Sequence, residues 1–138
     1  MPRFAAHSGW LRTFISIRIN VAPGTSAEEF LTDFTPGCEM VLESCRFVAS
    51  GDGAGAGATR TLRVIKGTAT VAATGTVALA STTTKGAITA LTPASDLIDR
   101  TFRDGDLITV DLASGGTQFT TLTGNVILRF RQRLQADA

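Results

Sequence analysis

The chain has 138 residues, of which 43% are hydrophobic and 18% are charged. This size and balance fit one domain with one core, and they exclude a disordered chain or a coiled coil. A formal net charge of +1 gives no overall electrostatic attraction to nucleic acid or anionic lipid. The sequence has one histidine and no tyrosine, so it has few side chains of the types used in catalysis. We therefore expect no enzyme activity, no cofactor, and no nucleic acid, membrane or small-molecule substrate as a partner.

The clearest predicted strand covers residues 11–21, where apolar residues occupy every second position. A period of two is typical of a strand that turns one face to a core. Pro23 follows and ends it. Residues 26–34 remain open between two structures. Their first four residues fit a capping box that begins a short helix, whereas the spacing of Phe30 and Phe34 fits the alternation of a strand.

The next predicted strand covers residues 39–49. Its apolar residues fall on both faces, and a β-bulge near Glu43 and Ser44 would reconcile them. The glycine-rich segment 51–57 follows, and its spacing matches neither a phosphate-binding loop nor a dinucleotide fingerprint. We interpret it as a flexible hairpin tip that leads into a strand over residues 60–66.

Short strands separated by turns continue to the end of the chain, with a turn of helix or a loop at residues 95–99. The further predicted strands are 68–80, 86–92, 107–112 and 125–134. This series predicts an all-β fold, a single antiparallel β-sandwich or jelly roll of about 7–8 strands. We divide the chain into an N-terminal arm (1–10), a β-sandwich domain (11–134) and a C-terminal tail (135–138).

The cysteines, the histidine and the aspartates of this sequence are not spaced as catalytic or metal sites require. Cys38 and Cys45 are seven residues apart in an extended segment, roughly 23 Å at ~3.3 Å per residue, so they cannot bridge each other. We expect two buried reduced thiols and no metal site. His7 has no nucleophile motif beside it, and Asp104 and Asp106 flank a glycine in a turn that aspartate closes.

Arginine is the one charged residue type whose pattern has a functional interpretation. Arginines alternate along the last predicted strand and lie on the polar face of the first, which gives one set: Arg12, Arg18, Arg129, Arg131 and Arg133. We predict that this set contacts an oligomer neighbour or another protein, with a solvated face as the alternative. Nucleic-acid binding is less favoured, because no exposed aromatic residues are interleaved for base stacking.

The chain shows no signal for a membrane or for export. No apolar run approaches the roughly 20 residues that cross a bilayer. The first residues lack the apolar core of a signal peptide. We therefore expect synthesis in the cytosol.

Four segments together have the layout of a known family. They are the arm before residues 11–17, the block PGCEMVLESCRFV at 36–48, the Gly-Ala segment 51–57 and RDGDLITV at 103–110. This layout resembles the small β-sandwich decoration, or cement, proteins of tailed bacteriophages, which bind the outside of assembled capsids.

The resemblance implies a virion structural protein that sits on a shell of major capsid protein as a homotrimer and stabilises the shell. A trimer combines several weak contacts into tight attachment. We expect the arm to reach the capsid, because an unpatterned segment with aromatic residues can order on a partner, and the expected contacts are Arg3, Phe4, His7 and Trp10. Burial in the core is the alternative for Phe4 and Trp10.

A second function also fits a trimeric jelly roll: a receptor-binding or fibre-head module of a phage. Such a module would recognise a glycan or a cell surface. The absence of tyrosine and the single tryptophan weaken this alternative, because aromatic faces are the usual platforms for sugars.

Overall fold

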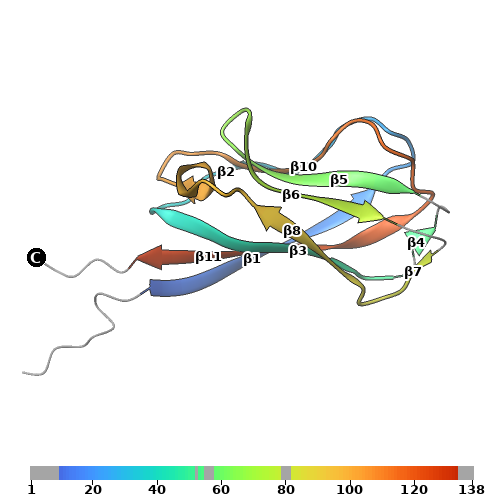
Figure 1. Ribbon diagram of the computed structural model, residues 1–138, viewed down its shortest axis with the longest axis horizontal. Helices are drawn as coiled ribbons and strands as arrows, with labels where there is room; N and C mark the ends of the chain where they lie inside the picture. Colours follow the sequence, from blue (N-terminus) through green and yellow to red (C-terminus); the bar gives the residue numbers. More distant parts are fainter. Residues whose placement is uncertain (1–9, 52, 55–57, 79–81, 134–138) are drawn as a thin grey trace, which may run out of the picture.

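The computed structural model describes residues 10–51, 53–54, 58–78 and 82–133 (Figure 1). Apart from one short 3-10 helix, η2 (Leu97–Arg100), the regular structure in these ranges is β-strand. The strands are β1 (Trp10–Val21), β2 (Glu28–Phe34), β3 (Met40–Ala49), β4 (Gly53–Ala54), β5 (Thr59–Lys66), β6 (Thr70–Ala78), β7 (Thr82–Thr83), β8 (Ile88–Pro93), β9 (Thr101–Phe102), β10 (Ile108–Leu112) and β11 (Leu122–Arg133). The all-β antiparallel fold expected from the sequence is confirmed.

The eight longer strands pair as nested hairpins. The first pairs with the last (β1 with β11), β2 pairs with β10, β3 with β8, and β5 with β6 in the middle, all antiparallel. Neighbouring pairs then join into one path, β1-β11-β3-β8-β6-β5-β10-β2. This nesting of a long hairpin around a central one is the jelly-roll topology.

The path bends into two layers, which Figure 1 shows as β1, β11 and β3 below and β2, β10, β5 and β6 above. β8 joins the layers, because Ile88–Leu91 pair with β3 whereas Thr92 and Pro93 pair with β6. On the other side, β1 and β2 end the path and no ladder joins them within the described residues. The sandwich is thus closed along β8 and open along β1 and β2.

The core fills the space between the layers with every second residue of the strands. In β11 the predicted inward set, Val126, Leu128 and Phe130, is completely buried. The rings of Phe130 and Phe102 meet edge to face, with centroids 5.8 Å apart. Strand alternation therefore turns the intervening residues, arginines among them, outward.

The segment that the sequence left open between helix and strand is the strand β2. Its residues pair with β10, and Phe30, Leu31 and Phe34 pack against the core. Glu28, part of the expected capping box, instead accepts a hydrogen bond from the backbone N–H of Ala22 at 3.1 Å. Tertiary pairing and burial thus outweigh a local capping signal.

Arg60 is fully buried on the inner face of β5. Its guanidinium donates hydrogen bonds to the carbonyl oxygens of Gly24 (2.6 Å), Ser26 (2.7 Å) and Ala113 (3.0 Å). The first two belong to the connection from β1 to β2, and the third to the connection from β10 to β11. One side chain thus fastens two connections that cross between the layers.

Replacement of Arg60 by methionine should destabilise the fold by roughly 3 kcal/mol, because it removes three hydrogen bonds from a charged donor to part-buried carbonyl oxygens. Denaturant unfolding followed by circular dichroism measures this loss. Arg103→Met is the matched control, since Arg103 is exposed and its pair with Glu39 is long, at 3.6 Å. Equal midpoints for the two variants would contradict a structural role for Arg60.

Candidate partner-binding surface

The outer surface of β1, β11 and β3 gathers arginines from distant parts of the chain, and we call it the arginine face. Cross-strand register sets its rows, in which Arg12 lies opposite Arg131 and Phe14 opposite Arg129. One strand further, Arg46 lies opposite Ile127. The arginines of this face among the described residues are Arg12, Arg18, Arg46, Arg129 and Arg131.

Glu43 is the carboxylate among these arginines, and a β-bulge places it there. Arg129 lies opposite Ser44 whereas Phe130 lies opposite Leu42, so Glu43 is the extra residue of β3. The bulge that the sequence predicted near Glu43 and Ser44 is therefore confirmed. One Glu43 oxygen lies 3.3 Å from Nε of Arg12 and the other lies 3.8 Å from Nε of Arg131.

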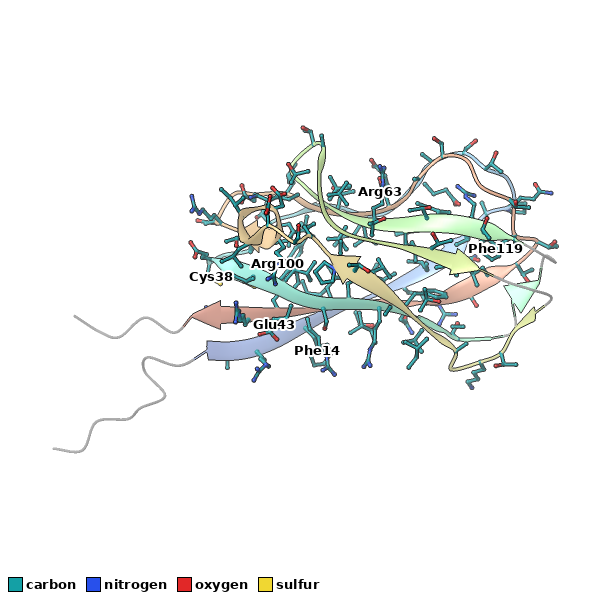
Figure 2. All side chains as sticks on the ribbon, viewed as in Figure 1. Phe14, Cys38, Glu43, Arg63, Arg100 and Phe119 are labelled. Carbon is teal, nitrogen blue, oxygen red and sulfur yellow. The ribbon has the colours of Figure 1, made fainter. Side chains whose placement is uncertain are left out.

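Phe14 is the most exposed large apolar residue described, with 69% of its surface accessible. Figure 2 shows it pointing away from the sandwich on the side of Glu43. With Arg12, Thr13 and Arg129 it lines a shallow groove of about 140 Å³. An exposed aromatic ring between guanidinium groups is a typical composition of the centre of a protein–protein contact.

The opposite outer surface has a different electrostatic character. Arg63 of β5 donates to both carboxylate oxygens of Asp111 of β10, at 2.9 Å and 2.6 Å. The hydrogen bond to Asp111 raises the pKa of Arg63, so the guanidinium stays charged within this salt bridge. The two residues line an open hollow of about 490 Å³ with Glu29, Ile65 and Thr109.

The structure brings together most of the arginines that the sequence singled out. Arg12, Arg18, Arg129 and Arg131 share one face. Arg133 lies opposite Trp10 in the ladder of β1 and β11, and the structure describes the backbone of both but not their side chains. The other residues expected to touch a capsid, Arg3, Phe4 and His7, lie outside the described residues.

Sequence reasoning missed three features of this surface. Phe14 is exposed, although no exposed aromatic residue was expected beside the arginines. Arg46 belongs to the face, and Glu43 holds two of its arginines. The period of two in residues 11–21 already placed Phe14 on the polar side, so that signal was present; the contacts of Glu43 required the long-range register.

The aspartates expected to close turns have that role at one site. Asp106 Oδ2 accepts from the backbone N–H of Arg103 at 2.8 Å, and the Asp106 N–H donates back to the Arg103 carbonyl at 3.0 Å. Gly105 between them has a φ of +92°, which favours glycine. Within the described ranges, no group of three or more metal-ligating side chains comes together.

Both cysteines are free, but their surroundings differ from the expectation of two buried thiols. Cys45 is buried in the core, and burial raises its pKa to about 12. Cys38 is only partly buried, because it lies in the β2–β3 connection rather than inside a strand.

A thiol reagent at pH 8 should therefore modify the folded protein at Cys38 alone. Cys45 has almost no thiolate at that pH, because the proton leaves only as pH approaches its raised pKa. Counting modified thiols before and after addition of denaturant checks this, with one expected before and two after. Rapid reaction of folded Cys38→Ser protein would contradict the assignment.

The described part of the chain includes no helix that is long and apolar enough to span a membrane. Comparisons with known proteins add no identity: no family model matches the chain, and neither does any curated protein or solved structure. The fold and the arginine face are thus the observations on which a function must rest.

Proposed function

We propose that the protein is a capsid decoration protein of a tailed phage, which binds the outer surface of the assembled shell as an oligomer, in the first instance a trimer, and stabilises it. The arginine face is the observation that carries this proposal. The face has five arginines and one carboxylate, so it favours a partner surface rich in Asp and Glu. A jelly roll whose described part brings together no group of three or more metal-ligating side chains is compatible with such a mechanical role.

The contact we propose has Phe14 at its centre. Aromatic residues and arginine contribute most to binding where they become fully desolvated, and Phe14 with Arg129 provides both in one cross-strand pair. Arginine presents a planar fork that binds a carboxylate through two hydrogen bonds, so it gives orientation as well as attraction. Glu43 holds Arg12 and Arg131 in place, which lowers the entropy lost on binding.

The stabilising effect follows from several such contacts made at once. Each copy contributes one face, and an oligomer places its faces on neighbouring capsid subunits, so that later contacts form at high effective concentration. In this proposal further contacts come from Arg3, Phe4 and His7 of the arm and from Trp10, which the structure places at the start of β1 rather than in the arm. Removal of residues 2–9 then weakens attachment while the β domain still folds.

Co-sedimentation with shells assembled from the major capsid protein of the same source tests the proposal. We expect saturable binding that weakens as salt concentration rises. Arg46→Glu with Arg129→Glu should weaken binding about tenfold or more, because it places carboxylates against an acidic partner surface. Lys85→Glu, which makes half of that change in net charge, is the control for an exposed cation outside this face, in the turn before β8.

Two outcomes would contradict the proposal. Absence of binding to both immature and expanded shells would favour the receptor-binding or fibre-head function instead. Equal loss of binding in the Lys85→Glu control and the double variant would show that binding does not depend on the arginine face in particular. Melting temperatures of all variants should match, because Arg129 is exposed and Arg46 points out of the core.

A further inference from the structure

Arg46 of β3 is a partly buried arginine whose guanidinium has no acceptor among the described residues. Its Nε atom is covered by neighbouring atoms and makes no hydrogen bond there. Nε of Arg60 and of Arg100 is covered in the same way, but terminal nitrogens of both side chains donate to backbone carbonyl oxygens. A covered donor without an acceptor costs stability, and each such group calls for an explanation. An anion bound at Arg46 would remove this cost.

Strand register places two further polar side chains beside Arg46. Arg129 of β11 lies opposite Ser44, and Ile127 lies opposite Arg46. Ser44 and Arg46 are two residues apart on β3, so both point outward, and Arg129 is the diagonal neighbour of Arg46. Diagonal neighbours have Cα atoms roughly 7–8 Å apart, which is within reach of long side chains. The two guanidinium groups and the Ser44 hydroxyl can therefore meet at one place on the outer surface.

No carboxylate neutralises Arg46 or Arg129 in the described part of the chain. Glu43 is the acid of the arginine face, and its two oxygens lie 3.3 Å from Nε of Arg12 and 3.8 Å from Nε of Arg131. Arg129 is exposed, so its side chain can turn toward a ligand. The complement of these two positive charges is a ligand with two negative ones.

We infer that Arg46, Arg129 and Ser44 form a binding site for a phosphate group. A phosphate group carries a charge of about −1.5 to −2 at pH 7 and has three strong acceptor oxygens. Each guanidinium fork can donate to two of these oxygens, and the Ser44 hydroxyl can donate to another. A carboxylate has two oxygens and a single charge, so it would leave one of the two arginines uncompensated. Donor number and charge therefore both favour phosphate.

This site goes beyond the proposed capsid contact, because its ligand is a phosphate-bearing molecule and the isolated protein binds it. The two proposals meet at Arg129, which the capsid contact also uses. A bound phosphate would keep an acidic capsid surface away from the centre of the arginine face. One consequence rests on the proposed function: phosphate should weaken shell binding more than chloride does at equal ionic strength.

Titration of the full-length protein with inorganic phosphate, at pH 7 and constant ionic strength, tests the site. The readout is the NMR signals of the backbone amides and of the arginine Nε–H groups. We expect saturable shifts at Arg46 and Arg129, and much weaker binding of acetate. Arg46→Met and Arg129→Met should each weaken phosphate binding about tenfold. Arg46→Lys should weaken it as well, because lysine keeps the charge but loses the planar fork.

Arg103→Met is the matched control, since it also removes one positive charge but from an exposed side chain outside the arginine face. It should leave phosphate binding unchanged. Arg46→Met should not lower the melting temperature, because it removes a covered donor that has no acceptor in the described structure. If the melting temperature does fall, the exposed Arg129 variant decides the result on its own.

Phenyl phosphate identifies the source of the phosphate group. Phe14 lies opposite Arg129, so its exposed ring can stack on a ring carried by the ligand. Tighter binding of phenyl phosphate than of inorganic phosphate, with the gain lost in Phe14→Ala, supports a phosphate ester of a larger molecule as the ligand. Equal binding of the two supports free phosphate.

Three results would overturn the inference. They are shifts that rise with phosphate without saturating, acetate binding as tight as phosphate binding, and a loss in Arg103→Met equal to that in the Arg46 and Arg129 variants. Co-sedimentation with shells keeps the two proposals apart. A protein that binds phosphate but no shells contradicts only the capsid proposal, and one that binds shells but no phosphate contradicts only this site.

Discussion

The pairing of the first long strand with the last is the constraint on which the rest of this structure depends. Twelve residues of β1 lie against β11, although residues 22–121 separate the two strands in the chain. Closing so long a loop costs conformational entropy that local contacts do not repay. The buried alternate residues of both strands offset that cost, and the same alternation turns Arg12, Phe14 and Arg129 outward together. The same strand pairing therefore forms the core and determines which residues lie together on the outer surface.

The bulge at Glu43 shows how a small irregularity changes that surface. A regular β3 would turn successive residues to opposite faces throughout, with one fixed register against β11. The extra residue allows Leu42 and Cys45 both to lie in the core while Glu43 reaches Arg12 and Arg131 outside. The bulge therefore reconciles the apolar pattern of the strand with an ion-pair cluster on the outer face.

Local sequence patterns predicted the strands well and their partners hardly at all. Alternation identified β1, β5, β10 and β11, and the conflict of faces within residues 39–49 identified the bulge. The segment of β2 stayed open because a capping signal and a strand signal coincide there. Arg60 was not singled out, because its burial depends on carbonyl groups from two connections far away in sequence. The arginines were recognised as a set, but the places of Phe14 and Glu43 among them depend on register.

The two outer faces of the sandwich differ in how their charges are compensated, and this difference is why we propose the lower one as the partner-binding surface. On the upper layer Arg63 and Asp111 neutralise each other within hydrogen-bond distance, so a ligand there would have to compete with an existing ion pair. On the lower layer the arginines outnumber their one carboxylate, and Phe14 remains in water. An exposed positive charge and an exposed aromatic ring cost the free protein little stability. They contribute most to the free energy of binding when a partner surface that is acidic, with an apolar centre, removes both from solvent. A surface with this composition is better explained by binding than by folding, since the core is complete without it.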